Sequence, residues 1–281
     1  MKPVPVPENL QAVVAGALAE DIGGGDLTAN LVPAGSRATA TIIAREPCVV
    51  CGIPFVDAAL RQVDPQTRVS WLVGEGDLVP AQTKLCTIAG LARSLLTTER
   101  VAINFLQTLS ATATATRRHV DAVAGTRAKV VDTRKTIPGL RLAQKYAVRV
   151  GGGANHRIGL FDGILIKENH IIAAGGIVPA LAAARAQAAP GTMIQIEVET
   201  LAQLEAAIAA GATLILLDNF TPERMAEAVR ITAGRAELEA SGGINLDTIR
   251  TYAQTGVDRI SIGTLTKDVK AIDLSMRFQA N

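Results

Sequence analysis

The spacing of hydrophobic and polar residues divides the chain into two stretches with different patterns. In the first, apolar positions recur at helical spacing at residues 8–20, 54–63 and 91–116. β-Branched runs with partial period-two alternation lie at residues 37–50, 67–73 and 84–89. Pro, Gly and Asp turn signals separate these runs. The first ~110 residues are therefore predicted to form an α+β layer of antiparallel strands and helices.

After about Gly125, strand, loop and helix patterns alternate. Short apolar runs that predict strands lie at residues 129–131, 163–166, 193–198, 214–217, 237–240 and 259–262. Helical patterns such as those at 201–210 and 222–231 separate them. This alternation predicts parallel strands joined by helices, and units of roughly 20 to 30 residues favour an α/β barrel. The tail, residues 271–278, alternates apolar and polar positions and is predicted to return as a strand.

Positive charge is concentrated between Arg127 and Arg157, where eight Lys or Arg residues stand against a single acid, Asp132. The whole chain is only +2, so the remainder carries about −5. Because short apolar runs flank this segment, we expect its cations at strand ends, where they present positive charge to an anion. The ligand should therefore carry several negative charges.

Composition excludes several classes of protein. Hydrophobic residues make up 48% and aromatic residues only 3%, which fits a soluble globular protein and disfavours a base-stacking nucleic-acid binder. No long apolar segment follows Lys2 and no apolar run reaches membrane-spanning length, so neither a signal peptide nor a membrane span is expected. Three cysteines predict a reducing, cytoplasmic location. Cys48 and Cys51 have C-x-x-C spacing without a second pair, so no redox or zinc site is expected.

Polar residues terminate nearly every apolar run of the second stretch. They are Asp132 with Thr133, Arg134 and Lys135; Lys167; Glu197 and Glu199; Asp218 with Asn219; Ser241, Gly242 and Gly243; and Gly263 with Thr264. The carboxyl ends of barrel strands open onto one face, so these residues are expected to converge there as an active site. The alternative for any single Asp or Glu is a cap on the following helix. Six such strand ends in succession favour the active site.

Two features of this set suggest the parts of a phosphorylated sugar. Glycine turns at residues 241–243 and 262–264 follow the last two strands, where backbone amides and a helix amino terminus could bind phosphate. Glu197 and Asp218 are two carboxylates that could hold ribose hydroxyls or a metal ion, and their oxygens suit Mg²⁺. With the cationic segment, they predict a phosphorylated sugar that meets a second, anionic substrate.

Four segments carry more specific motifs: VDTRKT at 131–136, GGANHR at 152–157, ILIKENH at 164–170 and SGGI at 241–244. Supporting segments read EDIG at 20–23, GDLT at 25–28 and TERVAINF at 98–105. Together they closely resemble the quinolinate phosphoribosyltransferase family, whose members are also called carboxylating nicotinate-nucleotide pyrophosphorylases. The resemblance spans essentially the whole chain, and each motif is specific to that family and its near relatives.

The resemblance implies an α/β fold with an amino-terminal α/β sandwich domain and a carboxy-terminal open α/β barrel, TIM-like but incomplete. The sandwich would occupy residues 1–110 with the return of 271–281, and the barrel, with the phosphate and substrate sites, residues 111–270. A homodimer is implied in which one subunit's amino-terminal domain covers the other's barrel mouth. The implied reaction converts quinolinate and phosphoribosyl pyrophosphate to nicotinate mononucleotide, pyrophosphate and CO₂, with Mg²⁺, in NAD biosynthesis.

The resemblance also implies a role for each site residue. Arg134, His156 and Arg157 would hold the two quinolinate carboxylates, joined by Arg100 from the partner subunit. Lys135 and Lys167 would meet phosphate or carboxylate charge, while Glu197 and Asp218 would hold the ribose and its metal. These two lysines and two carboxylates are the expected catalytic residues. The 5-phosphate would lie at Ser241, Gly242, Gly243 and Gly263, and Thr133, Ile262 and Thr264 complete the substrate-binding set.

Two segments depart from the family pattern. Lys267 stands where a histidine is expected, and it could still contact phosphate as a cation. Residues 110–114 read SATAT where SGIAT is expected, a change that should affect helix packing only.

Three other functions remain open. One is a paralogous pyrophosphorylase-like protein, such as the one linked to molybdate uptake, that acts on a different acceptor; retention of Arg100, Arg134 and Arg157 argues against it. Another is a Schiff-base aldolase that uses Lys167. The third is nucleic-acid binding through the basic segment, which the scarcity of aromatic residues disfavours.

Overall fold

The computed structural model describes residues 4–279, which form two compact units. The first unit holds the described residues up to Arg117, the segment Thr136–Gly152 and the described residues from Thr266 onward. The second unit consists of Arg118–Lys135 and Gly153–Leu265. In this division residues 111–117, 136–152 and 266–270 belong to the first unit. The domain boundary near residue 110 stays a prediction. Of the tail that was expected to return, residues 280–281 lie outside the described residues.

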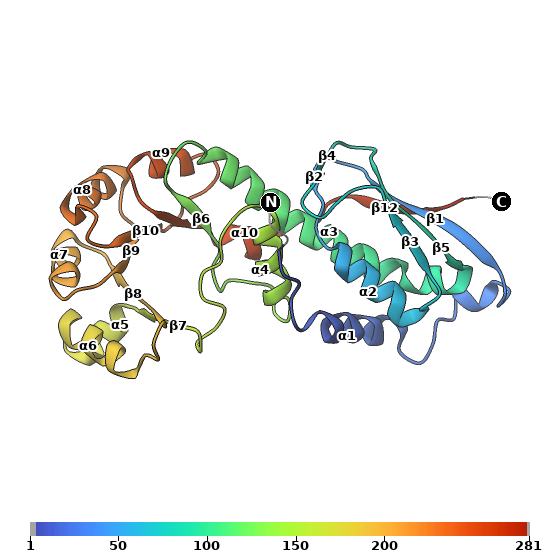
Figure 1. Cartoon of the computed structure of the whole chain (residues 1–281), viewed down its shortest axis with the longest axis horizontal. Coiled ribbons are helices and arrows are strands. Elements are labelled where there is room, and N and C mark those ends of the chain that lie inside the picture. Colours follow the sequence, from blue (N-terminus) through green and yellow to red (C-terminus); the bar gives the residue numbers. More distant parts are fainter. Residues whose placement is uncertain (1–3, 280–281) are drawn as a thin grey trace. The chain divides into compact units, whose positions relative to one another are not determined.

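An antiparallel sheet in the order β12-β1-β5-β3 forms the centre of the first unit (Figure 1). Its strands are β12 (Leu274–Phe278), β1 (Arg37–Ala44), β5 (Lys84–Leu91) and β3 (Arg68–Trp71). A smaller sheet pairs β2 (Cys48–Val49) with β4 (Leu78–Val79). The tail does form a strand, because β12 pairs with β1 with Phe278 opposite Ala40.

Helices make up much of the rest of the first unit. They are α1 (Leu10–Ile22), α2 (Ile53–Val63), α3 (Ala92–Ala122) and α4 (Arg141–Val150), with a short 3₁₀ helix at Ala29–Leu31. Helices α2 and α3 pack against the larger sheet, whereas α1 and α4 pack against α2 and α3 in a second core cluster. Period-two alternation turns Ala40 and Ile42 of β1 inward, where they are buried in one core with residues of α2 and α3. On the other side of α2, the ring of Phe55 stacks on that of Phe105 with centroids 5.2 Å apart. The boundary between the two units falls within α3.

A partly buried carboxylate, that of Glu75, links α2 to α4. Oε1 of Glu75 accepts hydrogen bonds from the Gly52 backbone N–H at 2.7 Å and from the Tyr146 hydroxyl at 3.0 Å. Its Oε2 accepts the backbone N–H of Ile53 at 3.0 Å. These two N–H groups stand at the start of α2, where no intrahelical partner exists. Burial raises the pKa of Glu75 despite these bonds. The hydrogen bond from Tyr146 fixes α4 to the start of α2 through this carboxylate.

The hydrophobic pattern did not predict α4, which lies within the cationic segment. Three of its cations, Arg141, Lys145 and Arg149, lie on this helix at four-residue spacing and so share one side of it. Lys145 is buried. The expectation that all cations of the segment lie at strand ends is therefore wrong for α4, which belongs to the first unit.

Six parallel strands in the order β6-β11-β10-β9-β8-β7 form the sheet of the second unit. They are β6 (Lys129–Val131), β7 (Gly163–Ile166), β8 (Met193–Val198), β9 (Leu214–Asp218), β10 (Glu237–Ser241) and β11 (Arg259–Ser261). Among the described residues, β6 and β7 are the two edges of this sheet, whereas a closed barrel would pair them. The second unit is therefore an open α/β barrel, as expected.

Helices follow the strands of this unit. They are α5 (Glu168–Ala174), α6 (Ile177–Gln187), α7 (Leu201–Ala209), α8 (Pro222–Thr232), α9 (Ile249–Gln254) and α10 (Thr264–Lys267). The boundary between the two units falls within α10. Figure 1 shows α6, α7, α8 and α9 in succession along the outer side. Throughout the described range, no helix combines the length and apolar character needed to cross a membrane.

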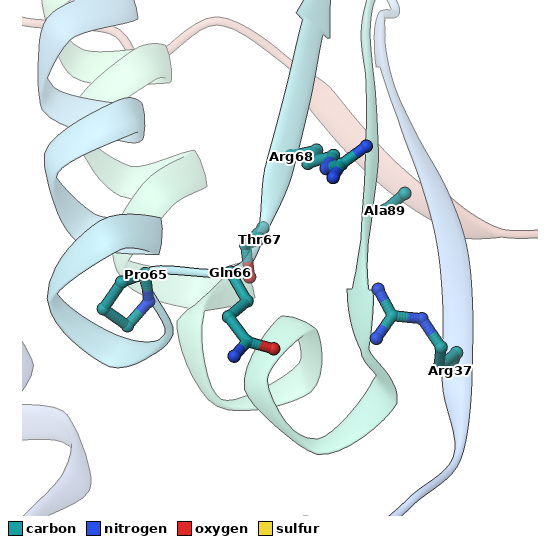
Figure 2. A pocket seen from close by; sticks show the side chains of 6 residues that line it. All are labelled: Arg37, Pro65, Gln66, Thr67, Arg68 and Ala89. Atoms are coloured by element: carbon teal, nitrogen blue, oxygen red, sulfur yellow. The ribbon is translucent and has the colours of Figure 1, made fainter.

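A groove of about 670 Å³ lies beside the larger sheet of the first unit (Figure 2). Its lining residues are Arg37, Pro65, Gln66, Thr67, Arg68 and Ala89. Figure 2 shows Arg37 and Arg68 on β1 and β3, the strands that flank β5. The lining holds two cations but no carboxylate, thiol or imidazole, so it offers no acid, base or nucleophile.

The C-x-x-C pair is buried in the first unit. Cys48 lies on β2 and Cys51 just beyond it, Cys86 lies on β5, and all three thiols are free. Burial raises the pKa of Cys48 to about 11 and that of Cys86 to about 12, and it also raises the pKa of Cys51. Because the thiolate is the reactive and metal-binding form, these cysteines are structural.

The folded protein should not react with a thiol reagent such as dithionitrobenzoate at pH 8, since the raised pKa values keep the thiols protonated and burial excludes the reagent. Release of the chromophore, followed by absorbance, should begin only on unfolding and then reach three equivalents. Protein unfolded in guanidinium without reductant is the control. Rapid labelling of the native protein, or a titre of one after unfolding, would reveal a reactive thiol or a Cys48–Cys51 disulfide.

Candidate active site

All predicted site residues except Arg100 lie in the second unit, and most of them stand at or just beyond the carboxyl ends of its strands. Thr133, Arg134 and Lys135 follow β6; Lys167 follows β7; Glu197 lies in β8; Asp218 ends β9; Ser241 ends β10, before Gly242 and Gly243; and Ile262, Gly263 and Thr264 follow β11. Parallel neighbours place these ends at one edge of the sheet. His156 and Arg157 join them from the loop after Ala154, which bridges to Val131 of β6.

Glu197 and Asp218 face the same side of the sheet at that edge. Glu197 is in register with Leu216, and Asp218 lies two residues farther along the same strand. Burial raises the pKa of Glu197. The ammonium of Lys167, 3.7 Å from Glu197 Oε2, lowers this pKa, while the charges of Asp218 and Glu199 raise it. Two carboxylates that repel each other form a place for positive charge.

Neither of these carboxylates caps the helix that follows it. The side chain of Thr200 caps α7 by accepting the N–H of Gln203, and that of Thr221 caps α8 in the same way. The alternative role of helix cap is thus excluded for Glu197 and Asp218.

The turn after β10 requires glycine at position 242. Gly242 has a φ of +105°, and a Cβ atom there would collide with the Asn219 side chain. The Asn219 N–H donates to the carbonyl of Ser241 at 3.0 Å, which ties the loops after β9 and β10 together. Helix α9 begins only at Ile249, so this turn is not itself a helix amino terminus. Gly263, by contrast, directly precedes α10.

Lys135 lies beside the turn after β11. A Cβ atom at Gly263 would lie 3.2 Å from Cδ of Lys135. The hydroxyl of Thr133 accepts the Lys135 backbone N–H at 3.0 Å, which shapes the loop that carries this lysine. An ammonium group next to a glycine turn suits a phosphate, which accepts hydrogen bonds from both.

Arg134 and Arg157 are close enough for their charges to interact. Burial lowers the pKa of Arg157, the charge of Arg134 lowers it further, and Asp162 acts in the opposite direction. Nη1 of Arg157 donates to the carbonyl of Gly163 at 2.9 Å. Two guanidinium groups brought together in this way favour an anion between them, and their planar forks fit carboxylates.

His156 is held through both ring nitrogens. Nδ1 accepts the backbone N–H of Arg157 at 2.7 Å, and Nε2 lies 2.7 Å from Oε1 of Gln195. The buried Asp132 fixes the same loop, because its Oδ1 accepts the His156 N–H at 2.8 Å and its Oδ2 accepts the Asn155 amide at 2.7 Å. The backbone that carries Arg157 is therefore firmly anchored.

Sequence reasoning missed Gln195 and Glu239, two fully buried polar residues of β8 and β10. Nε2 of Gln195 donates to Oε2 of Glu239 at 3.0 Å. Their positions in the sequence could have indicated them. Gln195 stands two residues before Glu197 and Glu239 two residues before Ser241, so each shares a strand face with a predicted site residue.

Two other cations singled out in the sequence lie in the first unit. Arg100 is an exposed residue of α3. Lys267 lies at the end of α10, with Nζ 2.7 Å from each carboxylate oxygen of Asp268. The structure thus gives Lys267 a local acidic partner.

Glu197 and Asp218 are the side chains best suited to a metal ion. No group of three or more His, Cys, Asp or Glu residues that could hold an ion occurs in the part of the chain that the structure describes. Two carboxylates suit Mg²⁺, which commonly takes its other ligands from water and substrate phosphates. The donor set therefore fits Mg²⁺ bound mainly through a substrate.

Comparison with known proteins connects both units to one family. The model of the quinolinate phosphoribosyl transferase C-terminal domain matches residues 112–277, and that of the N-terminal domain matches residues 26–110. The chain is similar to the nicotinate-nucleotide pyrophosphorylase [carboxylating] of Mycobacterium leprae, with 46% identity over 270 residues, 92% of this chain and 94% of the relative. A probable enzyme of the same name from Bacillus subtilis is 41% identical over 257 residues, 92% and 89% of the two chains. The solved structure of the nicotinate-nucleotide pyrophosphorylase from Francisella tularensis matches with a TM-score of 0.94 and 46% identity over 98% of each chain.

Lys167→Met should raise the pKa of Glu197 further, because it removes the positive charge that holds this pKa down. A ¹³C NMR titration of the glutamate side chains, assigned with Glu197→Gln, measures the change. Lys129→Met is the matched control, since Lys129 begins β6 at the opposite edge of the sheet. An unchanged pKa in Lys167→Met would mean that the ammonium and the carboxylate are not paired in solution.

Proposed function

The chain belongs to the quinolinate phosphoribosyltransferase family, and from this premise we propose how its residues carry out the reaction. The reaction joins quinolinate to the ribose of phosphoribosyl pyrophosphate and yields nicotinate mononucleotide, pyrophosphate and CO₂, a step of NAD biosynthesis. The pairing of Arg134 with Arg157 supports the proposal most directly, because it forms a site for a dicarboxylate.

Arg134 and Arg157 grip the two carboxylates of quinolinate. A guanidinium binds a carboxylate through two parallel hydrogen bonds and cannot lose its proton, so these residues orient the planar ring. His156 supports the same end of the substrate, and Lys135 and Lys167 add positive charge near the carboxylates and phosphates. The ring nitrogen is thereby held toward the ribose, with its reacting atoms in contact.

The ribose lies against Glu197 and Asp218. When pyrophosphate leaves, positive charge develops on the sugar, and the two carboxylates stabilise that charge electrostatically. The backbone of the glycine turns, with Ser241, Ile262, Gly263 and Thr264, holds the 5-phosphate, and Thr133 shapes the loop of Lys135 beside it.

Glu197 and Asp218 would also hold Mg²⁺ together with the sugar. The bound ion would supply positive charge that stabilises the departing pyrophosphate. Lys135 and Lys167 act on the same leaving group as point charges. No side chain of this set has to donate a proton, because pyrophosphate leaves as an anion.

Loss of CO₂ follows from the bond that has just formed. The alkylated ring nitrogen is cationic, and it stabilises the carbanion that remains when the adjacent carboxylate leaves. A proton from solvent water then adds to this ring carbon and gives nicotinate mononucleotide. During this step Arg134 and Arg157 hold the ring through its second carboxylate.

The active form is a homodimer in which Arg100 reaches the partner's site. Arg100 is exposed on α3 and belongs to the first unit, while the other carboxylate-binding residues belong to the second. Arg100 of the partner subunit would add a third arginine to the cations around the two quinolinate carboxylates. We place the enzyme in the cytoplasm, where free thiols such as its three buried cysteines persist.

Incubation with Mg²⁺, phosphoribosyl pyrophosphate and either quinolinate or nicotinate tests this function. Mononucleotide and CO₂ should form from quinolinate alone. Arg134→Ala should lower kcat/KM for quinolinate by roughly 10²–10³, the equivalent of one lost bidentate contact of about 3–4 kcal/mol. The matched control is Arg127→Ala, which removes an arginine paired with Asp258 at the other end of β6. Turnover of Arg134→Ala close to that of Arg127→Ala would contradict the assignment.

Mixing Arg100→Ala and Arg157→Ala subunits should restore activity. After random exchange about half of the dimers are mixed, and each mixed dimer has one intact site, so about one quarter of wild-type activity should return. Mass spectrometry of differently tagged subunits verifies exchange, and each variant alone gives the baseline. If Arg100 acted within its own subunit, confirmed exchange would restore nothing.

A further inference from the structure

Three polar side chains form a buried chain beneath the site. Nε2 of His156 lies 2.7 Å from Oε1 of Gln195, and Nε2 of Gln195 lies 3.0 Å from Oε2 of Glu239. The His156 side chain is 8% exposed, and Gln195 and Glu239 are 0% exposed. They come from three segments: the loop after α4, strand β8 and strand β10.

The two ends of this chain determine the direction of every hydrogen bond in it. At one end the backbone N–H of Arg157 can only donate, so His156 Nδ1 must be an unprotonated acceptor. Nε2 of His156 then carries the proton and donates to the Gln195 carbonyl. At the other end the Gln195 amide group donates to the carboxyl of Glu239. All donors point the same way, from Arg157 to Glu239.

The chain lies one level below the residues that face the substrate. Gln195 precedes Glu197 by two positions on β8, and Glu239 precedes Ser241 by two on β10. Side chains two apart on a strand share a face, so Gln195 and Glu239 support that surface without belonging to its outer layer.

We propose that Gln195 and Glu239 are positioning residues that hold His156 in its Nε2-protonated form, so that Nδ1 fixes the backbone of Arg157 for quinolinate binding. The inference rests on the proposed function, because Arg157 is assigned there to a substrate carboxylate. His156 in this form acts through Arg157, since both of its ring nitrogens are already engaged in the protein alone.

Stability alone does not explain a carboxyl group at position 239. The residue of β9 in register with Glu239 is the apolar Leu216. On β11 it is Arg259, whose guanidinium pairs with Glu237 and not with Glu239. Oε1 of Glu239 is buried without a hydrogen-bond partner among the described residues. A buried oxygen in that condition lowers stability, whereas an apolar side chain of similar size would not. A positioning role accounts for the polar pair.

Variants at positions 195 and 239 separate positioning from simple support. Gln195→Met and Glu239→Met break the chain with little change in volume, whereas Glu239→Gln keeps an acceptor for the Gln195 amide. The Met variants should raise KM for quinolinate roughly tenfold and leave KM for phosphoribosyl pyrophosphate within about twofold. Glu239→Gln should behave as wild type. Thr232→Val, which removes a buried hydrogen bond to the Ala228 carbonyl on α8, is the control for lost stability.

NMR of ¹⁵N-histidine protein reads the ring of His156 directly, without substrate. The chain has three histidines, so His119→Gln and His170→Gln assign its signals by subtraction. The wild type and Glu239→Gln should show an unprotonated Nδ1 and a solvent-protected Nε2–H, and the Met variants should lose that protection. A protonated Nδ1 in the wild type would overturn the proposal.

The kinetic outcomes are equally decisive. An unchanged KM for quinolinate in both Met variants would overturn the proposal, as would equal rises in both KM values with a loss of thermal stability like that of Thr232→Val. If the wild type turns over no quinolinate, the proposed function fails on that result. The histidine spectra then test the buried chain by themselves.

Discussion

The parallel register of β8, β9 and β10 is the constraint on which the site depends. It aligns Glu197 with Leu216 and Leu216 with Glu239, so carboxylates from separate strands meet at one edge. Backbone hydrogen bonds fix this alignment, and a shift by one residue would turn every side chain of a strand to the opposite face. The charges of Glu197 and Asp218 repel each other, yet the sheet holds them together. Positive charge placed near these two carboxylates would therefore be stabilised.

The two arginines are likewise like charges that the fold holds close together. Arg134 and Arg157 stand on different loops, and each raises the energy of the other's charge. Asp132 anchors one of these loops from a fully buried position, so the pair cannot separate to escape repulsion. Negative and positive groups are thus held on opposite sides of one reaction, with Lys167 in contact with Glu197 between them.

Much of this could be predicted from sequence, because strand ends in a barrel are marked by abrupt changes from apolar to polar residues. The runs at 129–131, 163–166 and 193–198 match β6, β7 and β8 residue for residue. The burial of Gln195 and Glu239 was not predicted, because a polar residue inside a strand is normally taken to face solvent. Only the strand register shows that both side chains point inward. Helix α4 was not predicted because its cations resemble a binding surface, although Tyr146 ties it to the partly buried Glu75. Long-range contacts of that kind leave no local pattern.

The discontinuity of the first unit has a consequence for biosynthesis. Its central strand β1 pairs with β12, which the ribosome completes only after the entire second unit has been made. The pairing of β1 with β12 is therefore delayed, and the backbone N–H and C=O groups on that side of β1 stay unpaired for most of translation. The barrel can fold first, since all of its segments precede residue 266. A stalled or truncated chain that lacks β12 would thus carry an unprotected strand edge on β1, a site prone to aggregation.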